Sequence, residues 1–204
     1  MGSWSRGVAV AWIVGSLAAP TPVGAESLVR GPLDCSRGPD GQFFAALVTA
    51  PPTQPEGSTY TVRIGSLPSG EITHMGLYYI HDIATDYLLP AGTVYVPGSA
   101  HFVPHTGTAN VLPAARVWYE SGLLRVLLPA HVANGTGYTP PSVEFQLRVT
   151  AAVGAQLPLR LVRVRIAANV FLLGDLLTDC KSEPRSSVLA TTLVTPAVSQ
   201  NGSP

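Results

Sequence analysis

Five histidines and a few neighbouring carboxylates are the side chains of this 204-residue chain best suited to chemistry. His101 and His105 are four residues apart, so on a strand they share one face and could bind a metal ion together. His81, Asp82 and Asp86 could orient one another as a catalytic base. Two imidazoles fall short of a usual ligand set, and the sequence lacks a Gly-x-Ser-x-Gly nucleophile motif. We therefore interpret these groups as polar loop and rim residues, and predict no catalytic, cofactor-binding or metal site.

Two further groups of side chains are candidate surface contacts. Arg160, Arg163 and Arg165 are the densest positive cluster and could meet an acidic surface or a glycan, although such a cluster is also typical of the solvated polar face of an edge strand. Trp118 and Tyr119 could stack on sugar rings. A tryptophan buried in the core is the more common arrangement in immunoglobulin-like folds, and we favour it for Trp118.

The N-terminal segment predicts export. One arginine in residues 1–6 is followed by an apolar run over 7–19, then by two prolines and a small-residue end at 23–25. This order is typical of a secretory signal peptide, so residues 1–25 are predicted to be removed after Ala25. An uncleaved membrane anchor is the alternative, but the run is short and interrupted by proline. The remaining chain has no comparable apolar stretch, so we expect no transmembrane span.

Export makes the cysteines informative. Cys35 and Cys180 are the only two, and an isolated pair in an oxidising compartment predicts a disulfide. Such a bridge requires the first and last strands of the folded part to lie close together.

The sequence predicts that the body of the chain consists of strands separated by turns. Apolar and β-branched runs recur between Pro- and Gly-rich segments, and two of them alternate cleanly between apolar and polar residues. The runs are 43–50, 60–64, 73–83, 93–103, 111–119, 123–128, 143–149 and 159–173. In the last run the apolar parity switches after Leu161, which predicts a β-bulge. The pattern predicts an all-β, antiparallel, immunoglobulin-like β-sandwich of seven to nine strands.

One domain accounts for most of the chain. We expect a β-sandwich over residues 26–180 and a flexible tail rich in Ser, Thr and Pro over 181–204.

The chain holds 12 Lys and Arg against 12 Asp and Glu, and this zero formal charge argues against a nucleic-acid partner.

A motif in the middle of the chain resembles a known family. Residues 86–100, DYLLPAGTVYVPGSA, are similar to the recurring Asp-x-Leu-Pro-x-Gly and Val-x-Gly-Ser signature of the conserved repeat domain of bacterial surface proteins. The closing segment 169–180 resembles small exported actinobacterial proteins. The resemblance implies an immunoglobulin-like sandwich of the kind found in adhesins and other envelope proteins. Some of those domains carry Lys–Asn isopeptide bonds, but the single lysine here, Lys181, lies outside the predicted core.

The sequence leads to three functional hypotheses. The first is a secreted, non-enzymatic binding module, associated with the cell envelope and contacting an envelope polymer or another surface protein. The second is an extracellular carrier of a lipid or other hydrophobic small molecule, which requires a cavity between the sheets. The third is a hydrolase of unknown type that uses His81 and Asp82 or the His101 and His105 pair.

Overall fold

The computed structural model describes residues 24–37, 42–67, 76–104, 114–183 and 187–197. These residues form thirteen strand segments, three of which are only three residues long. The segments are β1 (Glu26–Cys35), β2 (Phe43–Thr49), β3 (Thr53–Pro55), β4 (Thr59–Ser66), β5 (Leu77–Leu88), β6 (Thr93–Tyr95), β7 (His101–Val103), β8 (Arg116–Glu120), β9 (Leu123–Ala133), β10 (Ser142–Val149), β11 (Gln156–Val170), β12 (Gly174–Ser182) and β13 (Val188–Thr195). The number exceeds the expected seven to nine partly because the run over 93–103 divides into β6 and β7.

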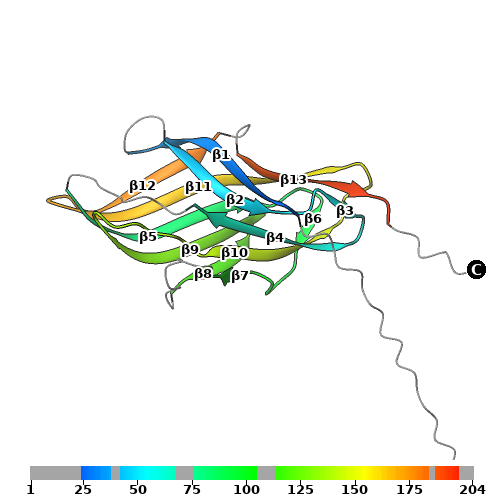
Figure 1. Ribbon diagram of the computed structural model, residues 1–204, viewed down its shortest axis with the longest axis horizontal. Coiled ribbons are helices and arrows are strands. Elements are labelled where there is room, and N and C mark those ends of the chain that lie inside the picture. The colour runs from blue at the N-terminus through cyan, green and yellow to red at the C-terminus, as the bar shows by residue number, and fades with distance from the viewer. Residues whose placement is uncertain (1–23, 38–41, 68–75, 105–113, 184–186, 198–204) are drawn as a thin grey trace, which may run out of the picture.

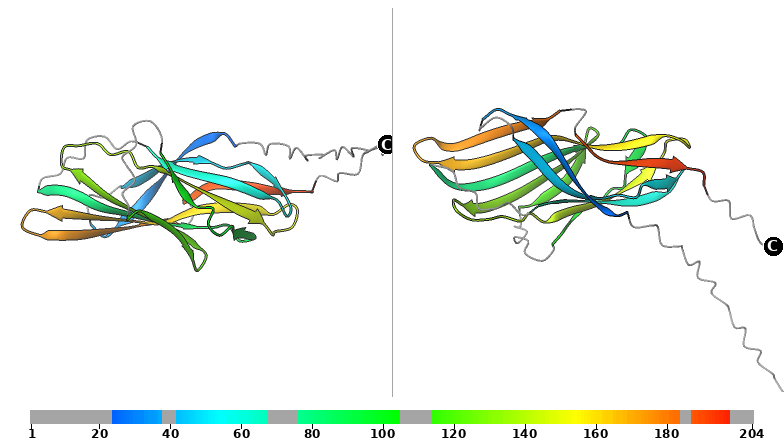
Figure 2. Two further views of the ribbon diagram at one scale, coloured as in Figure 1. Left: turned by 90° about the horizontal axis from the view of Figure 1, so that it is seen from below. Right: turned by 45° about the horizontal axis from the view of Figure 1, so that its top comes forward.

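Two antiparallel sheets pack face to face (Figure 1). Sheet A follows the order β6-β10-β4-β2-β1, with β7 also pairing with β10. Sheet B follows the order β12-β11-β5-β9-β8, and β13 pairs with β11 and, in parallel, with β3. The first strand joins the sheets, because β1 pairs with β2 along most of its length and with β12 at its end (Figure 2). The predicted immunoglobulin-like β-sandwich is confirmed.

The core lies between the two sheets and explains the alternating pattern of the sequence. Every second residue of β10 points inward, so Phe145 and Leu147 are fully buried, and Leu124 and Val126 meet them from β9. Burial of each such side chain stabilises the fold by about 1.5–3 kcal/mol. A second, smaller apolar cluster is built from Leu77, Ile80, Ala130 and Val132, on the strands β5 and β9 of sheet B.

The parity switch in β11 is a bulge, as predicted. Leu157, Leu159 and Leu161 are buried, and the register against β5 then shifts between Leu161 and Arg163. Beyond the shift it is Val164 that packs against the core. The bulge lets one 15-residue strand keep its apolar side chains inward along its length while its arginines point outward.

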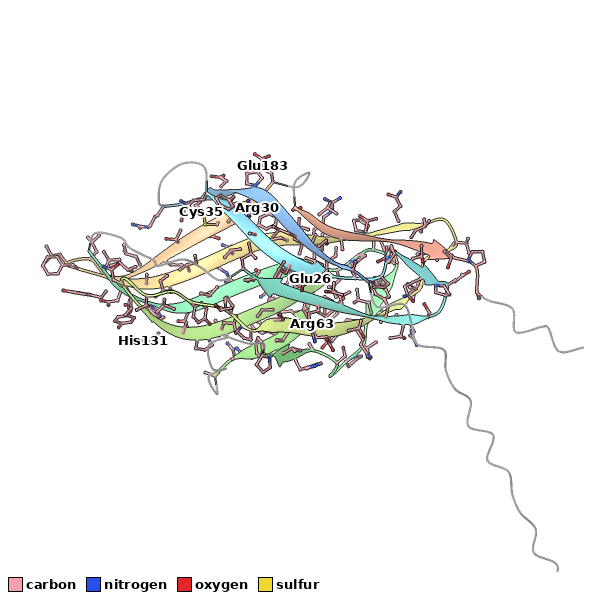
Figure 3. All side chains as sticks on the ribbon, viewed as in Figure 1. Glu26, Arg30, Cys35, Arg63, His131 and Glu183 are labelled. Atoms are coloured by element: carbon pink, nitrogen blue, oxygen red, sulfur yellow. A yellow bond between two sulfur atoms is a disulfide. The ribbon has the colours of Figure 1, made fainter. Side chains whose placement is uncertain are left out.

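The predicted disulfide is present where β1 meets β12. Cys35 and Cys180 are direct partners in the register of the two strands, and their Cα atoms are 3.9 Å apart. Cys180 is buried. The bridge therefore fastens sheet A to sheet B at the one place where β1 passes between them (Figure 3 labels Cys35).

The prediction of a flexible tail from residue 181 is wrong for residues 188–195. They form β13, whose Leu189 and Val194 belong to the main core. The hydroxyl of Thr192 donates a hydrogen bond to the carbonyl oxygen of Pro51 at 2.8 Å, so even the polar residues of this strand are anchored. β-Branched side chains fit a pleated surface, which is why the Val- and Thr-rich residues 188–195 pair as a strand.

The ends of the chain lie partly beyond the described residues. The signal peptide prediction falls on residues 1–23, which lie outside them, as do residues 198–204 of the predicted tail. Among the residues that the structure describes, no helix has the length and apolar character to cross a membrane.

Candidate binding face

Five strands of sheet B place five polar or aromatic residues in one line on its outer surface. The register pairs Trp118 of β8 with Arg125 of β9, Arg125 with Asp86 of β5, Asp86 with Arg163 of β11, and Arg163 with Lys181 of β12. We call this line the cross-strand row. Strands in a sheet are about 4.8 Å apart, so the row extends about 19 Å across the face.

Alternation along each strand turns the row outward. The neighbours Leu124 and Val126 of Arg125 are buried in the core, as is Cys180 beside Lys181. Val117 and Val164 likewise pack against the core, which directs Trp118 and Arg163 to the opposite side. Successive side chains on a strand point to opposite faces, so the whole row shares the solvent side of sheet B.

Ion pairs hold the middle of the row in place. Arg163 makes a two-pronged contact with the carboxylate of Asp179, with Nε 2.5 Å from Oδ1 and Nη2 against Oδ2. The hydrogen bonds from Arg163 hold the pKa of Asp179 below its ordinary value, and the same contact raises the pKa of Arg163. Arg165 Nη2 lies 3.2 Å from Oδ1 of Asp86, whose residue is only 5% exposed. Each of the two carboxylates is therefore the ion-pair partner of one arginine.

The β8 end of the row combines cations with an aromatic ring. Arg116 lies over Trp118, with its Cζ 5.0 Å from the ring centroid, at a distance typical of cation–π contacts. Arg125 Nη1 lies 3.0 Å from Oε2 of Glu120. The row and its immediate neighbours thus carry five cations, Arg116, Arg125, Arg163, Arg165 and Lys181, and five carboxylates, Asp34, Asp86, Glu120, Asp179 and Glu183.

The structure separates the sequence-predicted contact residues. Arg163 belongs to the row and Arg165 lies beside it, whereas Arg160 precedes the bulge and pairs in register with Leu88 and Val188. The arginines are not on an edge strand, because β11 has β12 and β5 on its two sides.

The two aromatic residues of β8 point to opposite faces. Trp118 is half-buried on the outer face and not in the core, so the favoured interpretation of a core tryptophan is wrong. Tyr119 points the other way and stacks on Tyr95 at 5.2 Å between centroids, which joins the edge of sheet B to the edge of sheet A.

The histidine candidates occupy separate places. A bulge in β5 turns both His81 and Asp82 outward, with Nδ1 2.7 Å from Oδ2 of Asp82 and Nε2 3.7 Å from Oδ1 of Asp175. His81 is therefore held between two carboxylates. Asp86, its other predicted partner, is bound to Arg165 instead.

The remaining histidine predictions are not brought together with His81. His101 lies on β7, where Nδ1 is 3.0 Å from the carbonyl oxygen of Ser99. Its predicted partner His105 lies outside the described residues. Within the described ranges, no three His, Cys, Asp or Glu side chains are grouped closely enough to hold a metal ion.

Sequence reasoning missed Arg116 and Arg125. The signal was present locally, because Arg125 alternates with Leu124 and Val126 in a strand pattern. Nothing in the sequence gives the order of strands in sheet B, which is what places β8 and β9 beside the arginines of β11.

Comparison with solved structures supports the fold. The chain is similar to a putative membrane-anchored protein from Corynebacterium diphtheriae, with a TM-score of 0.52 and 13% identity over 84% of this chain. The matched region spans 38% of that protein. At this identity the likeness shows the fold alone.

Two weaker matches are to the sixth cohesin of scaffoldin B from Acetivibrio cellulolyticus, in complex with a dockerin, and to domains D2 and D3 of the major pilin SpaD of C. diphtheriae. The cohesin has a TM-score of 0.39 at 13% identity, and the match covers 74% of this chain and 96% of the cohesin chain. The pilin domains have a TM-score of 0.37 at 14% identity, and the match covers 62% of this chain and 46% of the pilin chain. No protein-family model matches the chain, and no curated protein matches it.

Proposed function

We propose that the protein is an extracellular, non-enzymatic binding module of the cell envelope, and that the cross-strand row contacts an anionic envelope polymer. The observation that carries the proposal is the grouping of five of the twelve Lys and Arg side chains of the chain, Arg116, Arg125, Arg163, Arg165 and Lys181, in and beside one row of one sheet face. A polymer with repeated phosphate or carboxylate groups would place several charges along a row of about 19 Å.

Arg163 keeps donors for such a ligand. Each guanidinium has five N–H donors in a rigid fork, and the contact between Arg163 and Asp179 engages Nε and Nη2. The side chain of Arg163 is still 38% exposed. Asp179 therefore orients Arg163 and leaves part of its fork facing solvent.

Trp118 adds a surface that suits the sugar units of a polymer. Its ring is half-buried, with Arg116 against it, so it is held in one orientation without losing all contact with solvent. A rigid aromatic ring contributes contact area at little cost in conformational entropy.

Two features support the extracellular location. The disulfide between Cys35 and Cys180 is characteristic of exported proteins. The fold is also shared with a protein described as membrane-anchored.

The carrier hypothesis requires space between the sheets, and that region is occupied by side chains of both sheets, including the fully buried Phe145, Leu147 and Leu124. The hydrolase hypothesis requires a nucleophile or water next to a base, but both nitrogens of His81 face carboxylates. We therefore favour the binding module.

Co-sedimentation with isolated bacterial cell walls tests the proposal. The protein is exported through its own N-terminal segment, purified, and mixed with walls or with walls stripped of phosphate-containing polymer by acid. We expect saturable pelleting with intact walls, weaker pelleting with stripped walls, and a loss of affinity as salt is added.

Variants locate the contact. Arg116→Gln combined with Trp118→Ala removes one cation and the ring without breaking the pairs of Arg163 and Arg165, and we expect at least a fivefold loss of affinity. Arg148→Gln, an exposed arginine of sheet A, is the matched control and is expected to bind as the unmodified protein does. Equal binding by all three proteins would reject the row as the contact surface.

A further inference from the structure

The turn between β11 and β12 exposes three consecutive large apolar side chains. Phe171, Leu172 and Leu173 are 53%, 87% and 65% exposed, and we call them the 171–173 tip. Soluble proteins commonly expose single apolar residues, whereas a contiguous group of exposed apolar residues is typical of a surface that contacts another molecule or a membrane. The tip forms one end of the long axis of the molecule, and β13 ends toward the other (Figure 1).

The backbone holds the tip in a fixed shape. The N–H of Leu173 donates a hydrogen bond to the carbonyl oxygen of Val170 at 3.1 Å, which closes the turn. The N–H of Phe171 donates a hydrogen bond to the carbonyl oxygen of Gly76 at 2.7 Å. Leu172, at the third position of the turn, has a φ of +62°. Glycine and asparagine are the residues that adopt this conformation readily. The turn therefore displays a leucine at a position where folding alone favours a different residue.

Behind the tip the surface changes from apolar to polar over a short distance. Tyr78, itself exposed, packs edge-on against Phe171 with 6.0 Å between ring centroids. Two residues behind Phe171, Asn169 Nδ2 donates a hydrogen bond to Oδ1 of Asp175 at 2.8 Å. Two residues of strand are about 7 Å long, which matches the depth of about 5–10 Å to which apolar groups enter a membrane interface.

The shape and charge of this end favour a lipid surface as the occupant. A turn that protrudes can enter a fluid bilayer without a preformed pocket, and a tyrosine at the boundary is typical of the interface. Asp175 and Asp82 flank the histidine His81 behind the tip, so the nearest formal charges are acidic and would be repelled by anionic lipid. The described part of the chain enters β1 and leaves β13 away from the tip (Figures 1 and 2).

We propose that the 171–173 tip inserts into a neutral or zwitterionic lipid surface. This second contact uses a different part of sheet B from the cross-strand row and goes beyond the polymer-binding function. The tip supplies apolar side chains to the acyl boundary, Tyr78 lies at the headgroup level, and the polar pair of Asn169 and Asp175 stays in water.

Flotation with phosphatidylcholine vesicles tests the proposal. We expect the exported protein to float with the vesicles and Leu172→Asn to lower the partition coefficient about tenfold, since burial of one leucine side chain contributes at least that factor. Asparagine tolerates a positive φ, so this variant keeps the turn. Val153→Asn makes a similar change at another exposed loop residue and is expected to float as the unmodified protein does.

A second readout reports insertion directly. In a Phe171→Trp variant, the emission of the new indole is compared with that of the unmodified protein, and brominated lipid is expected to quench it. Failure of the unmodified protein to float, equal flotation of Leu172→Asn and Val153→Asn, or absence of quenching would each overturn the proposal. Flotation only with vesicles that contain phosphatidylglycerol would also overturn it, because that result assigns binding to the cations.

The two proposals can fail separately. The Arg116→Gln/Trp118→Ala variant retains the tip and is expected to float with phosphatidylcholine vesicles. Leu172→Asn retains the row and is expected to pellet with cell walls.

Discussion

Reduction of the bridge between Cys35 and Cys180 has a large and calculable effect on stability. The two cysteines are separated by 145 residues, so their bond closes almost the whole folded chain into one loop. In the chain-entropy treatment, such a cross-link removes about 17 cal/mol/K from the unfolded ensemble, which is about 5 kcal/mol at 25 °C. Domains are stable by about 5–15 kcal/mol, so this loss is a large share of the total.

Guanidinium chloride unfolding of the same protein with and without a thiol reductant measures this loss. We expect the free energy of unfolding to fall by about 5 kcal/mol and Tm to fall by roughly 10–20 °C. The two samples have the same side chains, so the comparison isolates the cross-link. A Cys35→Ala/Cys180→Ala variant, insensitive to reductant, is the control for direct effects of the reagent. A fall below about 1 kcal/mol would refute the reasoning, because it would mean that the unfolded chain keeps its ends together without the bond.

Three further predictions concern the charges of sheet B and the last strand. Arg165→Met leaves the carboxylate of Asp86 buried without its partner and should cost about 3–5 kcal/mol in denaturant unfolding, whereas Asp86→Asn added to it should restore much of the loss; equal stability of the two variants would contradict this. The pKa of Asp179 lies below its ordinary value because of Arg163, so this pair stabilises the fold above about pH 4 and the contribution is lost as pH falls through the lowered pKa. Arg163→Gln should therefore be less stable than the unmodified protein at pH 7, and the difference should shrink toward pH 2; a difference that does not change with pH would contradict the assignment. Truncation after Glu183 removes β13 and its buried Leu189 and Val194, and near-ultraviolet circular dichroism should show loss of fixed tertiary packing; an unchanged spectrum would show that the strand is dispensable.

Local patterns were enough to predict the class of fold and one of its irregularities. Alternation in β4 and β10 reflects one buried and one solvated face, and the structure has both. The parity switch after Leu161 predicted the bulge in β11, because a strand can keep its apolar side chains inward through such a switch only by adding a residue. The two cysteines predicted contact between the ends of the folded part for a covalent reason that needs no knowledge of the path between them.

The composition of a segment was a poor guide at the C-terminal end. Ser, Thr and Pro are frequent in flexible tails, but the residues of β13 gain stability from pairing with β11 and β3, which lie far away in the sequence. Tertiary pairing of this kind overrides local preference.

The candidate binding face depended on information that no single strand carries. Trp118 and Lys181 belong to one row only because β9, β5 and β11 lie between β8 and β12 in a fixed register. A shift of one residue in any of these pairings would turn an arginine toward the core. The 171–173 tip was hidden for another reason, since an apolar run at the end of a strand looks the same whether it is buried or displayed.

The path of β1 also has a mechanical consequence. A tensile load applied through the two ends of the folded region would be carried from β1 to β12 by the covalent bond between Cys35 and Cys180. Only the strand segments outside the bridge, most of β1 on one side and the end of β12 with β13 on the other, would lengthen as they peel away. The residues between the cysteines, including the whole cross-strand row apart from Lys181 and the entire 171–173 tip, would be shielded from extension while the bond is intact. Under tension, only these short end segments would therefore extend while the bond between Cys35 and Cys180 is intact. Reduction of the bond would allow the residues between the two cysteines to extend as well.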